Sequence, residues 1–218
     1  MSRFDLIVFD LDGTLVDSRR DIADSANALL VACGAAPLPE ATIGRMVGDG
    51  AAVLVRRAFE AARVPPPADA LDRFLEIYGR QLLVHTRPYP DVDRVLTELG
   101  ARASLALVTN KPGEATRRVL DGLDLLRHFA GDRIVAGDGP FPRKPDPSGL
   151  QHVMAASGAA ASRTMLVGDS AIDWRTGQRA SARVCVARYG FGFDGFPVAE
   201  LGADDLTIDA PAELLILL

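Results

Sequence analysis

Two aspartates, Asp10 and Asp12, follow directly after the apolar residues 6–9. An apolar run of this length is typical of a strand that is buried on both faces. Because residues i and i+2 of an extended segment point to the same side, both carboxylates can face one site, where their charges repel without a nearby cation. Mg²⁺, a hard cation that prefers oxygen ligands, would supply that charge. The alternative is a solvated loop after the strand that performs no chemistry.

Three further groups of polar residues follow apolar runs later in the chain. They are Thr109 and Asn110 after residues 105–108, Lys144 shortly after residues 134–136, and Asp169, Ser170 and Asp173 after residues 165–167. In an open parallel sheet, ligands bind outside the carboxyl ends of the strands. We therefore expect all four groups to meet at one edge of a sheet.

Lysine is rare in this chain. Lysine and arginine together number 24, but the only lysines are Lys111 and Lys144, and both lie in short segments that also carry turn residues after apparent strands. A compact ammonium differs from a planar guanidinium in size and geometry, so these two sites can require lysine specifically. Chance is the alternative explanation. For Lys111 we favour a solvated position at the rim of the site over a catalytic one.

The elements that would position these residues follow a clear order. Helical spacing of apolar residues predicts four helices without an intervening strand, near residues 21–31, 40–46, 51–63 and 68–85. From residue 91 onward, predicted helices and strands alternate, which is typical of a doubly wound parallel sheet. We therefore predict an α/β fold, a doubly wound parallel sheet with a Rossmann-like core. Residues 1–17 and 86–218 would form this core, and residues 18–85 a small helical cap inserted after the first strand.

Composition limits the class of protein. The chain has 218 residues, is 48% hydrophobic and carries a formal net charge of −5. This hydrophobic content suffices for a core, whereas the acidic balance argues against nucleic-acid binding, which needs a basic surface. No apolar run has the length of a membrane span and no signal peptide is recognisable, so we expect a cytoplasmic protein. The oligomeric state stays open between a monomer and a homodimer. Cys33 and Cys185 lie in apolar patterns and are expected to be buried free thiols.

Taken in order, the polar motifs resemble the four motifs of the haloacid dehalogenase superfamily. The matching segments are Asp10-Leu11-Asp12-Gly13-Thr14, Thr109-Asn110, Lys144-Pro145, and Gly168-Asp169-Ser170 together with Asp173. The resemblance covers the whole chain and is closest to the phosphoglycolate phosphatase branch, through residues 9–18, 47–51, 108–112 and 189–190. The predicted helical insertion resembles the cap that this family places after its first strand.

The requirements of phosphoryl transfer suggest a role for each residue. Asp10 is the expected nucleophile, which forms an aspartyl-phosphate. Asp12 is the expected general acid and base, which protonates the leaving alcohol and then deprotonates the attacking water. Lys144 would neutralise charge on the nucleophile and the transferred group, and Thr109 with the backbone amide of Asn110 would donate to the phosphoryl oxygens. Alternatively, Thr109 and Asn110 form only a turn and a helix start.

Metal ligands and their supports complete the expected site. Asp10 and Asp169 would hold Mg²⁺ together with, as the resemblance implies, the backbone carbonyl of Asp12. Ser170 and Asp173 would surround these ligands, with Asp173 orienting Lys144 or a metal-bound water. Asp173 could instead be the N-cap of the helix that follows, a role compatible with the first.

Within the superfamily, the resemblance favours a phosphatase. A dehalogenase would need no acid at Asp12, and a phosphonate hydrolase lacks that aspartate and uses a cap lysine, whereas residues 18–85 contain no lysine. The same absence disfavours a sugar-phosphate mutase. We predict a Mg²⁺-dependent phosphatase acting on a small phosphorylated metabolite, with 2-phosphoglycolate favoured by the resemblance. Nucleotides, sugar phosphates and pyrophosphate stay open as substrates, as does a non-catalytic protein that binds a phosphorylated ligand.

The predicted cap would select the substrate, because the core motifs contact only the phosphate. A cation such as Arg45 or Arg56 should then meet the carboxylate of 2-phosphoglycolate. The loop Gly48-Asp49-Gly50 is also expected to border the substrate. Asp49 could be the N-cap of the helix that begins near residue 51, or it could point into the site and select against anionic leaving groups.

Overall fold

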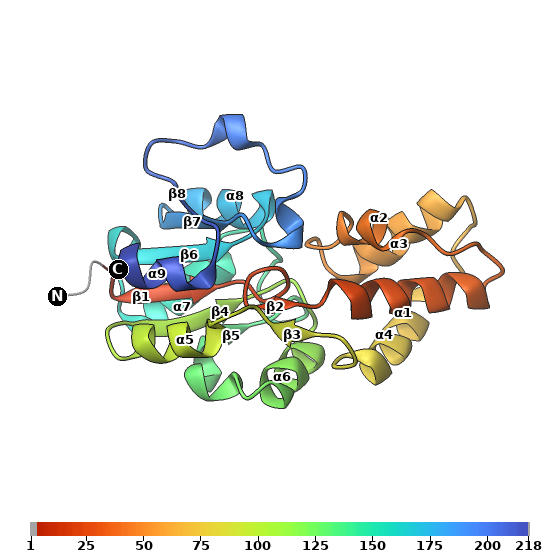
Figure 1. Ribbon diagram of the computed structural model, residues 1–218, viewed down its shortest axis with the longest axis horizontal. Helices are drawn as coiled ribbons and strands as arrows, with labels where there is room; N and C mark the ends of the chain where they lie inside the picture. The colour runs from red at the N-terminus through yellow and green to blue at the C-terminus, as the bar shows by residue number, and fades with distance from the viewer. Residues whose placement is uncertain (1–3, 218) are drawn as a thin grey trace.

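The computed structural model describes residues 4–217, and its centre is a sheet of six parallel strands (Figure 1). Their order across the sheet is β5-β4-β1-β6-β7-β8. The strands are β1 (Leu6–Phe9), β4 (Ser104–Val108), β5 (Ile134–Val135), β6 (Thr164–Gly168), β7 (Arg183–Ala187) and β8 (Leu206–Ile208). With β1 near the middle and successive strands added outward on both sides, this is the order of a doubly wound sheet, so the predicted fold class is confirmed.

Strand β1 is buried on both faces, as its unbroken apolar sequence predicts. Successive side chains of a strand point to opposite faces. Ile7 and Phe9 accordingly belong to one hydrophobic cluster and Leu6 and Val8 to another. Helices therefore pack on both sides of the sheet, and the carboxyl end of β1 opens toward its edge.

Four helices contribute to the two layers that cover the sheet. They are α5 (Val92–Gly100) on the face of Ile7, α7 (Ser148–Ser157) on the face of Leu6, α8 (Ala171–Arg179) against β6 and β7, and α9 (Leu214–Leu217) beside α5. A further helix, α6 (Gly113–Gly122), follows β4. Each of α5 to α8 lies between two strands in the chain, which agrees with the predicted alternation.

The four helices predicted before residue 86 form a separate group at the carboxyl ends of the strands (Figure 1). They are α1 (Arg19–Ala32), α2 (Glu40–Gly44), α3 (Ala51–Ala62) and α4 (Ala70–Gln81). Helix α1 contacts the other three, so this group has its own packing. Its apolar side chains nevertheless join the cluster that contains Phe9, so the helical group rests on the sheet through a continuous hydrophobic contact.

Two short strands connect the helical group to the sheet, and the sequence did not reveal them. Strand β2 (Val16–Asp17) pairs antiparallel with β3 (Arg87–Pro88). A two-residue strand shows no periodicity, so neither could be recognised from the pattern. The strands lie beside the predicted domain boundaries at residues 17/18 and 85/86, and this division of the chain stays a prediction.

Two smaller expectations concern the thiols and the membrane. Both cysteines are free, as expected, and Cys185 is buried, but the expected burial of Cys33 is wrong because its side chain is partly exposed. Within residues 4–217, no helix combines the length and the apolar character needed to cross a bilayer.

Candidate active site

Asp10 and Asp169 lie side by side because β1 and β6 are neighbours in the sheet. Each aspartate follows the last residue of its strand, and Phe9 is in register with Val167. The backbone N–H of Asp10 donates to the carbonyl of Val167 at 2.9 Å, which fixes the turn after β1. Chains leave these two strands in opposite directions across the sheet, and ligands of doubly wound folds bind at this point.

Lys144 forms ion pairs with two aspartates inside this edge. Its Nζ lies 2.7 Å from Oδ1 of Asp10 and 2.6 Å from Oδ1 of Asp173, and its side chain is 3% exposed. Burial alone would lower the pKa of Lys144, but the charges of Asp10 and Asp173 outweigh it and raise the pKa above its usual value. The ammonium therefore stays charged beside Asp10.

Three buried carboxylates form the acidic centre of the site. Asp10, Asp169 and Asp173 each offer an oxygen atom, and these oxygens all lie within 4.8 Å of one another. Burial raises the pKa of Asp10 to about 6, partly opposed by Lys144 and reinforced by Asp173. Burial, and next the charge of Asp173, also raises the pKa of Asp169 well above its usual value. Carboxylates held this closely favour a hard cation with oxygen ligands, so the donor set fits a divalent metal such as Mg²⁺.

The carboxylate of Asp169 is held in place by two backbone segments. Its Oδ2 accepts the backbone N–H of Gly192 at 2.7 Å. On its other side lies Gly13, whose φ of +88° favours glycine, and a Cβ built there would stand 1.8 Å from the same Oδ2. The glycine of the first motif is therefore needed so that the backbone can approach Asp169.

Asp173 supports both Lys144 and the start of helix α8. The N-cap of α8 is Ser170, and Asp173 occupies the third helical position of a capping box. Its Oδ2 accepts from the hydroxyl of Ser170 at 2.6 Å and from the backbone N–H of Ser170 at 3.2 Å. The alternative that Asp173 itself is the N-cap is therefore wrong, because the capping oxygen belongs to Ser170.

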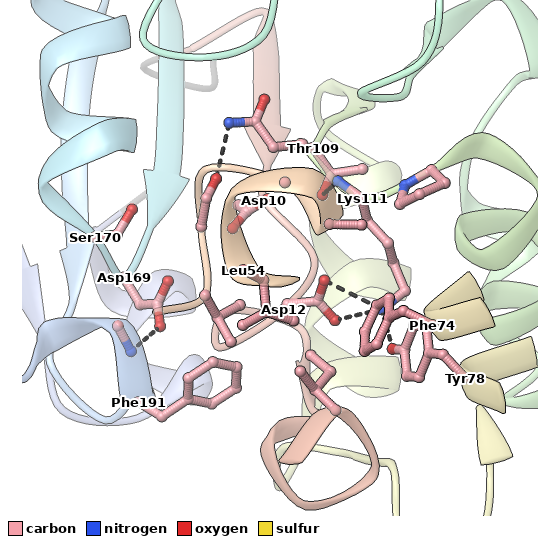
Figure 2. A pocket seen from close by; sticks show the side chains of 18 residues that line it. Asp10, Asp12, Leu54, Phe74, Tyr78, Thr109, Lys111, Asp169, Ser170 and Phe191 are labelled. Atoms are coloured by element: carbon pink, nitrogen blue, oxygen red, sulfur yellow. Dashed lines mark hydrogen bonds and ion pairs between the residues drawn. The ribbon is translucent and has the colours of Figure 1, made fainter. Parts of the chain in front are cut away.

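Asp12 lies on the other side of Asp10 and is held by two donors. The hydroxyl of Ser18 donates to its Oδ1 at 2.5 Å. The ammonium of Lys111 donates to Oδ1 at 2.9 Å and to Oδ2 at 3.2 Å, and it also contacts the hydroxyl of Tyr78 (Figure 2). The expectation that Lys111 is solvated is wrong, because its side chain is only 3% exposed.

Thr109 and Asn110 join the second motif to the third. Thr109 follows β4 and lines the pocket beside Asp10. The side-chain oxygen of Asn110 accepts the backbone N–H of Lys144 at 2.8 Å, and its amide donates to the carbonyl oxygens of Lys144 and Gly48 at 2.9 Å and 2.8 Å. The side chain of Asn110 therefore holds the Lys144 segment and the loop before α3 together, which is more than a turn requires.

A pocket opens above these residues, between the sheet edge and the helical group. Its cavity volume is about 60 Å³. The core contributes Asp10, Asp12, Thr109, Asn110, Lys111, Asp169 and Ser170, and the helical group contributes Ile22, Val47, Gly48, Gly50, Leu54, Phe74 and Tyr78. The side chains that the helical group contributes are thus mainly apolar, and Leu54, Phe74 and Tyr78 are labelled among them in Figure 2. A small polar molecule fits such a cavity better than a large one does.

The structure does not bring the predicted arginines of the helical group into this pocket. Arg56 is about half exposed and pairs with Glu60 one helical turn away, at 2.6 Å. Arg45 pairs with Asp194 at 3.4 Å, also outside the pocket. Arg56 lies on the solvent-facing side of the amphipathic helix α3, where charged residues are expected, whereas Arg45 follows the end of α2.

Both interpretations of Asp49 also need correction. The N-cap of α3 is Gly50, and no side-chain cap is present. Asp49 instead forms an ion pair of 2.6 Å with Arg57 and is not among the residues that line the described pocket. Gly48 and Gly50 do line it, so the loop borders the site through its backbone, with φ of +121° and +91° at the two glycines.

Several contributors to the pocket were not placed inside it by the sequence analysis, among them Lys111, Tyr78 and Phe191. The rarity of lysine did signal Lys111, whose segment lies beside the site. Tyr78 belongs to the apolar stripe of α4 and could not be distinguished there from packing residues. Phe191 follows β7 in a segment without periodicity.

Comparison with known proteins places this geometry in a family. The family model described as haloacid dehalogenase-like hydrolase matches residues 7–187. A phosphoglycolate phosphatase of Rhodospirillum rubrum is 39% identical over 206 residues, which cover 90% of this chain and 84% of that protein. One of Cupriavidus necator is 37% identical over 204 residues, covering 92% and 87%.

A solved structure agrees with these relatives over nearly the full length. The crystal structure of a predicted phosphoglycolate phosphatase from Haemophilus somnus is 30% identical and has a TM-score of 0.90, covering 100% of this chain and 99% of the other. The resemblance stated from the motifs is thereby confirmed. With the four motifs gathered at one sheet edge, this chain belongs to the haloacid dehalogenase-like hydrolase family.

Proposed function

We propose that this protein is a Mg²⁺-dependent phosphatase that hydrolyses 2-phosphoglycolate to glycolate and phosphate through an aspartyl-phosphate. The observation that carries the proposal is the position of Asp10, which is buried beside the ammonium of Lys144 and between two further aspartates, Asp12 and Asp169. The relatives named phosphoglycolate phosphatase, which align with most of this chain, support the substrate.

The first step would transfer the phosphoryl group to Asp10. A carboxylate oxygen of Asp10 attacks phosphorus, and the bond between phosphorus and the glycolate oxygen breaks. Asp12 gives its proton to that oxygen, because an alkoxide is a poor leaving group. In the second step Asp12 takes a proton from water, which attacks phosphorus and releases Asp10.

The charge of the transferred group requires neutralisation. Lys144 would contact the phosphoryl oxygens from the side of Asp10, and Thr109 would donate a hydrogen bond. Asp10, Asp169 and the backbone carbonyl of Asp12 are the groups that would hold Mg²⁺, which when bound supplies further positive charge at the phosphoryl oxygens. Asp173 and Ser170 keep Lys144 in place through the capping box.

The helical group of residues 18–85 would act as the cap over this site. Its supports are the pocket between the two parts and the connection through β2 and β3. The cap would exclude water during the transfer to Asp10, which would strengthen the electrostatic interactions of Lys144 with the phosphoryl group. Gly48 is fastened to the core by Asn110, so the loop before α3 would close against the phosphate.

A phosphate-release screen with Mg²⁺ tests the proposal. The substrates are 2-phosphoglycolate, a sugar phosphate, a nucleotide and pyrophosphate, and the Asp10→Asn variant is the control. We expect 2-phosphoglycolate to have the highest kcat/KM and the variant to lose all turnover, because the amide cannot act as the nucleophile. After acid quench, the wild-type protein should carry phosphate on Asp10. A higher kcat/KM for another class of substrate, or turnover by Asp10→Asn, would contradict the proposal.

A further inference from the structure

The phosphate end of the pocket is well supplied with charge, but the opposite end must recognise the rest of the substrate. The proposed substrate carries a carboxylate there, two bonds from the ester oxygen. A buried carboxylate needs a cation or several hydrogen-bond donors, because its desolvation is costly. The arginines of the helical group do not supply them, since Arg45 and Arg56 lie outside the pocket and pair with other carboxylates.

Lys111 is the one cation among the described residues that line the pocket. Its side chain is 3% exposed, and its Nζ forms an ion pair of 2.9 Å with Oδ1 of Asp12. Lys111 therefore carries a permanent positive charge inside an otherwise acidic and apolar cavity.

The ammonium of Lys111 can exchange one of its contacts for a ligand. Its three N–H donors face Oδ1 of Asp12 at 2.9 Å, Oδ2 of Asp12 at 3.2 Å and the hydroxyl of Tyr78. The contact with Oδ2 is the longer of the two to Asp12, and a bound carboxylate would replace it. The ammonium also lies 4.7 Å from the centre of the Tyr78 ring, which stacks on the ring of Phe74 with the ring centres 5.6 Å apart. These rings fix the position of the ammonium and exclude water from it.

Tyr78 adds a second donor at the same place. Its oxygen accepts from Lys111, and burial raises the pKa of its hydroxyl to about 12, so the hydroxyl keeps its proton. No acceptor for that proton is recorded among residues 4–217. A neutral phenol whose oxygen faces a cation is well suited to donate to an anion in the pocket.

We propose that Lys111 and Tyr78 together bind the carboxylate of the leaving group and so select 2-phosphoglycolate from neutral esters. This inference rests on the proposed function and assigns its specificity to one lysine of the core and one tyrosine of α4. The geometry is consistent, because the ester oxygen must approach Asp12 to receive a proton and Lys111 contacts that same carboxylate. A carboxylate two bonds from the ester oxygen can therefore reach the ammonium.

The arrangement also explains why a lysine stands at this position in an arginine-rich chain. A guanidinium is planar and larger, and it would have to fit between Asp12 and the ring of Tyr78. The ammonium can instead contact Asp12, Tyr78 and a ligand from three directions. Since Tyr78 belongs to α4 and Lys111 follows β4, bound carboxylate would also connect the helical group to the core.

A comparison of two substrates of equal length distinguishes binding of the substrate carboxylate by Lys111 from an indirect effect of Lys111 on Asp12. They are 2-phosphoglycolate and 2-hydroxyethyl phosphate, which replaces the carboxylate by a neutral hydroxymethyl group. We expect Lys111→Met to lower kcat/KM for 2-phosphoglycolate about 10- to 100-fold more than for 2-hydroxyethyl phosphate, the range expected for lost charge-assisted hydrogen bonds. Tyr78→Phe should lower the ratio of kcat/KM for 2-phosphoglycolate to kcat/KM for 2-hydroxyethyl phosphate by a smaller factor, of about fivefold. Arg117→Met, which removes an exposed cation from α6, is the matched control and should leave the ratio unchanged.

Binding to the Asp10→Asn variant gives a readout that does not require turnover. In this background, calorimetry should show that Lys111→Met weakens binding of 2-phosphoglycolate but not of inorganic phosphate. Equal losses for both esters, or equal losses for both ligands, would overturn the inference and leave Lys111 as a support of Asp12 alone. Wild-type protein that hydrolyses 2-hydroxyethyl phosphate as well as 2-phosphoglycolate would also overturn it. Hydrolysis of neither ester would instead refute the proposed function, and with it the inference.

Discussion

At the scale of single residues, the site separates two aspartates by their surroundings. Asp10 is paired with Lys144, whereas Asp12 is held by Ser18 and Lys111, on the side proposed for the leaving group. Two chemically identical side chains thus receive different partners, which suits one for attack and the other for proton transfer.

The leaving-group dependence of Asp12→Asn tests this division. Asparagine keeps the shape of the side chain but cannot transfer the proton, so the phosphorylation step should slow by about 10²- to 10⁴-fold for alkyl esters. An aryl phosphate needs less protonation and should lose much less in that step. Single-turnover kinetics with both kinds of substrate measure the difference. Equal losses would argue against Asp12 as the acid.

At the scale of elements, the buried carboxylate of Asp21 joins helix α1 to the segment that returns to the sheet. It accepts the backbone N–H groups of His85 and Thr86 at 2.9 Å and 2.8 Å and the hydroxyl of Thr86 at 2.7 Å. These contacts hold the start of α1 against the returning segment. The chain enters and leaves the helical group at this point, beside β2 and β3.

Removal of this carboxylate should destabilise the protein. Asp21→Ala leaves two backbone N–H groups without their acceptor, and we expect the free energy of unfolding to fall by about 3 kcal/mol. Asp21→Asn keeps one acceptor oxygen and should lose less. Asp24→Ala removes an exposed aspartate from the same helix and should change stability by less than about 0.5 kcal/mol. Urea unfolding of the three variants measures these values, and equal effects of Asp21→Ala and Asp24→Ala would contradict the assigned role.

At the scale of the whole molecule, the acidic centre links stability to pH and to metal. In the metal-free protein, burial raises the pKa of Asp10 to about 6 and that of Asp169 well above its usual value. These groups bind protons more readily in the folded than in the unfolded state, so their contribution to stability is present at low pH. It decreases as the pH rises from about 4 through 6.

Mg²⁺ should offset this loss, because it binds the ionised carboxylates. We therefore expect the melting temperature to gain more from Mg²⁺ at about pH 7.5 than at about pH 5. Without metal, Asp10→Asn should lose less stability than the wild type between these two pH values, since asparagine does not titrate. Thermal melts with Mg²⁺ or with a chelator measure both effects. An equal gain from Mg²⁺ at the two pH values would rule out the acidic centre as its site.

Much of this protein followed from its sequence alone. The apolar run of β1 ending in Asp10, and the later runs ending in Thr109 and Asp169, indicated a parallel sheet with one polar edge. Local pattern suffices for this inference, because burial on both faces requires unbroken apolar strands and chain order limits how such strands can be arranged. The family resemblance followed from the same motifs, since their residue types and order are specific.

Only the tertiary structure decided which side chains of the helical group reach the site. Periodicity shows that Tyr78 lies on the apolar face of α4 and Arg56 on the polar face of α3. It does not show how these two helices are placed against the sheet. Their packing brought Tyr78 to Lys111 and left Arg56 beside Glu60. The same packing gave Asp49 to Arg57. The contact of Tyr78 with Lys111 joins two elements and depends on how α4 lies against the sheet, which no local sequence pattern encodes. Arg56 and Glu60 are neighbours one turn apart in α3, but only the placement of α3 decided that this pair lies outside the pocket.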